Sequence, residues 1–280
     1  LDQAVAKMKD RDLDSSYAEG SKFKMENLSG LQKDRLYKLG KVWGFVKYHH
    51  PEIAKGNINW DNELFKILPA VNSDNFDSKL VEWISGIGSL EEGDHKLPQA
   101  DEVELTPNYD WIYDKNFLSE ELSAELKKVL TSKREKSNYY FGINAGVKNP
   151  VFKNERTYLD MSWDDTGVKL LGLFRYWNMM EYFNPNNYLT DKDWEEVLKE
   201  YIPCFITENT ELAYKKKMLQ LIGKVNDTHA NMWYFDEVLN KFFGTKRLPL
   251  AVEFIEEQPV VVKIADSSEV SIQEGDVITA

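Results

Sequence analysis

The sequence predicts a mainly α-helical protein in which a three-helix unit occurs twice and forms one helical body, followed by a short β segment that the chain leaves incomplete. Apolar residues recur at helical spacing along most of the chain, a segment repeats at a displacement of 134 residues, and the spacing becomes alternating near residue 250. The 280 residues suffice for about two domains. We expect a polar, weakly ordered leader at 1–28, a helical region at 29–245 and the start of a β domain at 246–280.

The composition is that of a globular protein, with 42% hydrophobic and 29% charged residues. A formal net charge of −12 disfavours phosphates and anionic lipid surfaces, so we expect no nucleic-acid partner. No run of 18 apolar residues is present, and we expect no membrane span. The single cysteine, Cys204, has no partner for an internal disulfide. Aromatic residues make up 13% of the chain, which indicates aromatic packing or a sugar- or peptide-binding surface.

The first copy, residues 29–96, contains three predicted helices. Ser29 and Gln32 have the spacing of a capping box, and Pro51 ends the helix that follows, because a proline disfavours helical geometry in the residue before it. The second helix starts at Trp60 and has Pro69 near its end. The third carries apolar residues at helical spacing, namely Phe76, Leu80, Ile84, Ile87 and Leu90.

The second copy, residues 161–245, repeats this pattern. Ten identical pairs lie in register at the displacement of 134: Leu36/Leu170, Leu39/Leu173, Trp43/Trp177, Tyr48/Tyr182, Pro51/Pro185, Trp60/Trp194, Leu64/Leu198, Pro69/Pro203, Asn75/Asn209 and His95/His229. Trp and Pro are too rare for such matches to be coincidental. We therefore predict three further helices and place the four repeated tryptophans in the core rather than on a sugar-binding platform.

The connector at 97–160 and the end of the chain complete the prediction. We expect a helix at 119–130, a strand at 139–143 and loops elsewhere in the connector. A helix at 234–243 ends at Gly244, and strands then start near residues 250, 259 and 276. Because a sheet that stops mid-strand leaves its ladder unpaired, we expect the parent protein to continue beyond this chain.

Several motifs resemble a known peptidase family. The segment Trp43 to Pro51 with Trp60-Asp61, and the segment Trp177 to Pro185, resemble the N-terminal region of C-terminal-processing (tail-specific) serine peptidases and their tricorn-like relatives. Asp227-Thr228-His229 resembles the Asp-x-His element of the tricorn-like members. Residues 247–280, with Gly275-Asp276-Val277-Ile278, resemble the opening half of a PDZ domain. The resemblance covers about residues 29–280.

This resemblance implies a serine endopeptidase, exported to the periplasm or cell envelope, that acts on peptide or protein substrates. The nucleophile would lie beyond Ala280, so the chain would be an inactive scaffold, substrate-access element or homo-oligomer contact. His229 matches the tricorn-like catalytic histidine, and Arg247, Leu248 and Leu250 occupy the place of a peptide-binding loop. The resemblance implies no cofactor and no metal.

Three points have alternative interpretations. The residues themselves favour a structural role for His229, because His95 occupies the same place in the first copy and both copies cannot be active. His49, His50 and Glu52 suggest a metal site only weakly, since adjacent residues on a helix point apart. The alternative function, drawn from another class, is a non-enzymatic peptide- or glycan-binding module of the cell envelope that uses the aromatic residues.

Overall fold

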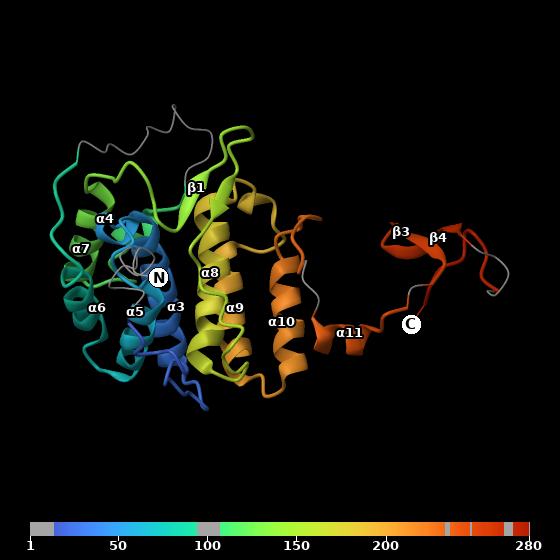
Figure 1. The fold of residues 1–280 in the computed structure, drawn as a ribbon, viewed down its shortest axis with the longest axis horizontal. Helices are drawn as coiled ribbons and strands as arrows, with labels where there is room; N and C mark the ends of the chain where they lie inside the picture. Colours follow the sequence, from blue (N-terminus) through green and yellow to red (C-terminus); the bar gives the residue numbers. More distant parts are fainter. Residues whose placement is uncertain (1–13, 94–106, 233–235, 247, 266–270, 280) are drawn as a thin grey trace, which may run out of the picture. The chain divides into compact units, whose positions relative to one another are not determined.

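The computed structural model describes residues 14–93, 107–232, 236–246, 248–265 and 271–279, which fall into two units, 1–233 and 234–280. The chain is mainly helical, with two small antiparallel strand pairs (Figure 1). The first unit contains α3 (Gly30–His49), α4 (Pro51–Ala54), α5 (Trp60–Ile67), η1 (Leu68–Asn72), α6 (Phe76–Ser85), η2 (Asp110–Tyr113), α7 (Glu120–Thr131), β1 (Phe141–Ile143), β2 (Pro150–Phe152), α8 (Thr166–Phe183), η3 (Asn187–Leu189), α9 (Trp194–Thr207) and α10 (Glu211–Gly223). The second contains α11 (Glu237–Phe243), β3 (Leu250–Ile255) and β4 (Gln258–Ile264).

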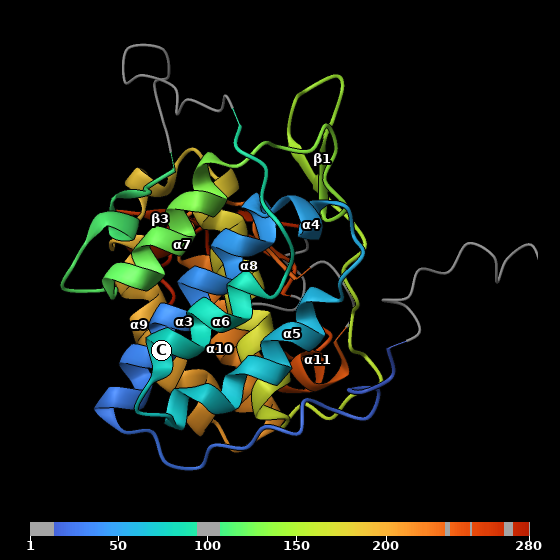
Figure 2. The same ribbon diagram turned by 90° about the vertical axis from the view of Figure 1, so that its left-hand side faces the viewer.

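The two segments of the predicted repeat contain helices in the same order. In the first copy α3 is followed by α5 with η1 and then by α6, and in the second α8 is followed by α9 and then by α10. The helices α3 and α8 pack against each other, α9 packs on both, and α10 packs on α9 (Figure 1). The helices α6 and α7 lie on the other side of the first copy, in front of α3 in Figure 2.

The repeated tryptophans join the first and second helices of each copy in the same way. The indole N–H of Trp43 donates to the carbonyl oxygen of Trp60 at 3.1 Å, and that of Trp60 donates to the carbonyl oxygen of Trp43 at 3.0 Å. The corresponding bonds between Trp177 and Trp194 measure 2.7 and 3.0 Å. All four side chains are buried, which confirms their predicted place in the core. Each indole thus buries its ring and satisfies its donor at once.

Equivalent residues of the two copies face each other where α3 crosses α8. The ring centroids of Tyr48 and Tyr182 lie 5.9 Å apart. A Cβ atom added to Gly44 would lie 1.8 Å from the side chain of its equivalent, Asn178, so the glycine is required by this close approach. Contacts between equivalent positions are the signature of a two-fold relation. The copies therefore form an internal pseudo-dimer whose axis passes between α3 and α8.

Two ion pairs join the copies across this pseudo-two-fold axis, each between a largely buried basic residue of one copy and an acidic residue of the other. Lys41 of α3 pairs with Glu195 of α9, and its equivalent Arg175 of α8 pairs with Asp61 of α5, the equivalent of Glu195. The carboxylate of Glu195 also accepts a hydrogen bond from Tyr37 at 2.9 Å. Each copy thus contributes one cationic side chain that pairs with a carboxylate of the other copy. Removal of Glu195 would leave the buried Lys41 without its ion-pair partner.

Two local predictions were wrong. Within the described part of the predicted leader, Phe23 and Met25 are buried, and the amide of Ser21 donates to Asp165 at 2.8 Å. These isolated apolar residues lack helical spacing but still pack into the core as an extended strip. The sequence predicts a loop around Pro150, but residues 150–152 form the strand β2. Proline is tolerated as the first residue of a strand, and β2 pairs with β1 in antiparallel register.

The second unit has the predicted helix, hairpin and third extended stretch. Gly244, with φ of +83°, ends α11, and the turn between β3 and β4 places Glu256 and Glu257 at φ of +51° and +64°. The amide of Ile278 donates to the carbonyl oxygen of Pro259 at 2.8 Å, so this stretch runs antiparallel to β4. Among the described residues, no helix has both the length and the apolar character that crossing a membrane requires.

Candidate functional site

His229, the predicted catalytic residue, lies in an exposed turn after α10. Its backbone amide and its ring Nδ1 lie 2.8 and 3.0 Å from the same carboxylate oxygen of Asp227. These two hydrogen bonds lower the pKa of Asp227. The side chain of His229 is 89% exposed, and His95, its equivalent, lies outside the described residues. Asp227 therefore orients the imidazole through a turn, and the catalytic role of His229 stays a prediction.

The predicted peptide-binding residues lie at the start of the β hairpin. Leu248 is exposed ahead of β3, and Leu250 is the first residue of that strand, opposite Ile264. Arg247 lies outside the described residues. The carbonyl oxygen of Pro249 accepts the amide of Ala265 at 2.7 Å, so the hairpin itself uses this backbone group. Peptide binding at these residues stays a prediction.

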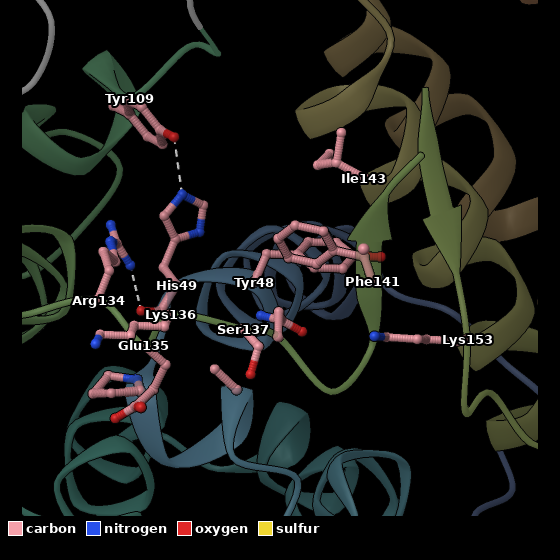
Figure 3. A pocket seen from close by; sticks show the side chains of 14 residues that line it. Tyr48, His49, Tyr109, Arg134, Glu135, Lys136, Ser137, Phe141, Ile143 and Lys153 are labelled. Carbon is pink, nitrogen blue, oxygen red and sulfur yellow. Dashed lines mark hydrogen bonds between the residues drawn. The ribbon is translucent and has the colours of Figure 1, made fainter. Parts of the chain in front are cut away.

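The structure brings other residues together in a cavity of about 540 Å³ at the C-terminal end of α3 (Figure 3). We call it the basic cleft. Side chains from α3, from the segment 134–138 and from the β1–β2 hairpin line it. They include Tyr48, His49, Tyr109, Arg134, Lys136, Ser137, Phe141 and Lys153. Of these only His49 is a candidate functional residue in the sequence, as part of a weak metal pattern.

His49 is held in one orientation at the wall of the basic cleft. Its Nδ1 lies 2.8 Å from the carbonyl oxygen of Phe45, and its Nε2 lies 2.9 Å from the hydroxyl of Tyr109. A carbonyl oxygen only accepts, so in the neutral ring Nδ1 carries the proton and Nε2 accepts from the tyrosine. Burial raises the pKa of Tyr109 to about 12, which keeps its hydroxyl a donor at neutral pH.

The three cations of the basic cleft have different roles. Arg134 donates to the carbonyl oxygens of His49 and Leu130, which lie at the ends of α3 and α7, and burial lowers its pKa. It thereby satisfies carbonyl groups that a helix end leaves unpaired. Lys136 and Lys153 are exposed and form no ion pair with any described residue. These two ammonium groups are available to an anionic ligand.

A second cavity of about 470 Å³ lies beyond Tyr182, whose ring stacks on that of Tyr109 with centroids 6.3 Å apart. We call it the asparagine pocket. Its lining is rich in amide and aromatic side chains, namely Asn108, Asn149, Tyr182, Phe183, Asn184, Asn187 and Tyr188. Two charged residues, Lys148 and Glu181, also line it. Burial raises the pKa of Glu181 to about 7. The nearby cation, Lys41, already pairs with Glu195, and no described residue forms an ion pair with Glu181.

The remaining histidine and the cysteine have local partners. His50 is buried at the N-terminus of α4, where its Nδ1 accepts the amide of Glu52 at 3.2 Å. Burial lowers the pKa of His50 to about 4, so it is neutral at physiological pH. Cys204 is half-buried in α9, and its Sγ lies 3.4 Å from the carbonyl oxygen of Glu200. Among the described residues, no group of three His, Cys, Asp or Glu side chains is placed to hold a metal ion.

No family model, curated protein or solved structure matches this chain. The peptidase resemblance therefore rests on its sequence motifs. Of these, the tryptophans at 43, 60, 177 and 194 are core residues, and Pro51 marks the junction of α3 and α4. The sequence does not predict the two cavities, because most of their lining comes from the connector and from loops. The signals that point to them are the asparagines at 184, 186 and 187 and the basic run at 133–136.

Proposed function

We propose that this chain is the non-catalytic N-terminal part of an exported serine endopeptidase of the C-terminal-processing or tricorn-like type. In this proposal the helical unit is a scaffold, a substrate-access element or a dimer contact for a catalytic core, and the second unit is the start of a PDZ-like domain. The observation that supports it most is the pairing of residues 248–265 with one another and with residues 271–279. The β3–β4 hairpin is followed by Gly275-Asp276-Val277-Ile278 running antiparallel to β4, which is the order expected for the opening of a PDZ-like sheet.

The non-catalytic role is supported by the surroundings of the candidate nucleophiles. Among the described residues, no serine, threonine or cysteine is hydrogen-bonded to a histidine or a lysine, the arrangement that activates such nucleophiles. Ser137 of the basic cleft forms no hydrogen bond with a described residue. An activity of the parent protein would therefore use a nucleophile outside these residues.

A fluorophosphonate probe, which reacts with activated serines, tests the proposal in the full-length protein. We expect labelling of the full-length protein, together with cleavage of an unfolded protein substrate, and no labelling of the 280-residue chain. A full-length protein that neither reacts with the probe nor cleaves peptide bonds would contradict the proposal.

The second candidate is a non-enzymatic peptide- or glycan-binding module of the cell envelope. It is favoured by the two cavities, both of which combine aromatic side chains with polar groups and leave side chains available to a ligand. The coding sequence downstream of Ala280 discriminates the two functions. A core with a Ser–Lys or Ser–His pair supports the peptidase, and an unrelated domain or a stop codon supports the binding module.

A further inference from the structure

The two copies differ most clearly at the end of their first helices. In the first copy His50, Pro51 and Ile53 are all buried, and the helix α4 closes this end of the bundle. In the second copy the equivalent of Ile53 is Asn187, and the following residues Tyr188 and Leu189 are 67% and 61% exposed. The first copy shows that the repeated unit is able to bury this segment. The exposed aromatic and amide groups of the second copy are therefore not a requirement of the fold.

The amide groups of the asparagine pocket are held in fixed orientations. The Nδ2 of Asn184 donates to Oδ1 of Asn187 at 2.9 Å, and the Nδ2 of Asn187 donates to the carbonyl oxygen of Met180 at 2.8 Å. The Oδ1 of Asn184 accepts the amide of Asn186 at 3.1 Å. Because each Nδ2 carries two hydrogens, each of the two amides keeps one donor for a ligand. Such pre-orientation lowers the entropy lost on binding.

Glu181 adds a carboxyl group without a buried cation of its own. Its equivalent in the first copy, Lys47, is fully buried and pairs with Glu155 at 2.6 Å. The charged and titratable groups around Glu181 are Lys41 from α3, Glu195 and Asp193 at the start of α9, and Tyr109 and Tyr182 at its sides. The exposed Lys148 lines the same pocket. Lys41 forms its ion pair with Glu195 and not with Glu181. Glu181 is therefore a group that accepts hydrogen bonds from hydroxyls but does not require a cationic ligand.

We propose that the asparagine pocket binds an uncharged pyranose ring of a saccharide. The apolar face of the ring stacks on the exposed Tyr188, and the ring hydroxyls bond to the carboxyl group of Glu181 and to the free N–H groups of Asn184 and Asn187. The cavity volume of about 470 Å³ lies in the range of small-molecule sites. The proposal names a ligand for the second candidate function and is independent of the peptidase proposal.

Saturation-transfer NMR and titration calorimetry with three neutral probes, maltotriose, cellotriose and N-acetylchitotriose, test the proposal. We expect the 280-residue chain to bind at least one of them with millimolar affinity. Tyr188→Ala removes the stacking face and should weaken binding about tenfold. The control is Tyr113→Ala, because Tyr113 is an exposed tyrosine too, at 51%, but lies in η2, outside the pocket lining. We expect no change in affinity for this variant.

The possible outcomes separate the two proposals. An absence of saturation transfer to all three saccharides, or equal affinities for the wild type and the folded Tyr188→Ala variant, would overturn the saccharide site. Binding of a blocked tri-alanine peptide in place of the sugars, lost in Tyr188→Ala, would also overturn the saccharide assignment, although a binding function would survive. None of these results bears on fluorophosphonate labelling, which tests the peptidase proposal separately.

Discussion

The substitution Gly44→Ala is the sharpest perturbation of the pseudo-two-fold contact. The new methyl group would lie 1.8 Å from Cγ of Asn178, far inside the van der Waals limit. Asn178 has little freedom to move, because its Nδ2 donates to the carbonyl oxygens of Gly40 at 3.0 Å and Phe174 at 2.8 Å. Either the side chain must leave both bonds or α3 must move away from α8.

The expected cost follows from these contacts. Overpacking a filled core costs about 1–3 kcal/mol, and each lost hydrogen bond costs about 0.5–1.5 kcal/mol. Alanine in place of glycine returns roughly 0.5–1 kcal/mol through its higher helix propensity. We therefore expect Gly44→Ala to lower the free energy of unfolding by about 3 kcal/mol. For a unit of this size that corresponds to a fall in Tm of roughly 6–12 °C.

Thermal and urea unfolding followed by circular dichroism measure the effect. The control is Gly172→Ala in α8, where the nearest atom to the added methyl group, Cε of Met218, lies at an ordinary 3.6 Å. We expect this variant to be more stable than the wild type by about 0.5–1 kcal/mol. Asn178→Ala should restore much of the stability of Gly44→Ala. A Gly44→Ala variant as stable as the wild type, or strictly additive effects of the two substitutions, would refute the close crossing of α3 and α8.

Three further substitutions have defined outcomes. Because the pKa of Glu181 rises from 4.5 to about 7 on folding, the folded state keeps a proton that the unfolded state has released, and wild-type stability falls as pH rises through this interval. Glu181→Gln removes this loss, so the stability of the variant relative to the wild type should increase by about 3 kcal/mol between pH 4.5 and 8. Urea unfolding measures this difference in the free energy of unfolding, and a difference that does not change with pH would contradict the burial of this carboxyl group. The pKa of His50 falls from 6.5 to about 4 on folding, so the wild type loses stability as pH falls through that range. His50→Asn keeps an acceptor at the N-terminus of α4 and should lose about 3 kcal/mol less on acidification, and an unchanged acid profile would argue against burial of this ring. Trp177→Ala should lower the free energy of unfolding by about 3–5 kcal/mol, and an unaltered Tm would argue against its core position.

The helices could be predicted because their signals are local. The capping box at Ser29, the proline at 51 and the glycine at 244 lie where the helices begin or end. The repeat also has a local signal, because tryptophans at equal spacing form the same reciprocal bonds in both copies. The strand at Pro150 pairs with the nearby residues 141–143, but three residues are too few to show an alternating pattern. The segment around Phe23 is held by a contact far along the chain, between Ser21 and Asp165, and it has no periodic pattern.

The cavities depend on how the copies and the connector meet. Tyr109 reaches His49 across 60 residues, and Lys41 meets Glu195 across 154. Hydrophobic spacing carries no information about such pairs. The repeat nevertheless offers a guide. Asn187 of the second copy stands where the first copy has the buried Ile53, and such a polar replacement indicates a position that no longer belongs to the core. Comparison of the copies would have pointed to the asparagine pocket before the structure was known.

The most direct test of the proposed role is to locate the serine that a fluorophosphonate probe modifies in the full-length protein, by digestion and mass spectrometry. We predict that the modified serine lies outside residues 1–280 and that the 280-residue chain alone folds but remains unmodified. Modification of a serine within this chain, or a full-length protein that the probe leaves untouched, would contradict its assignment as the non-catalytic part of a serine peptidase.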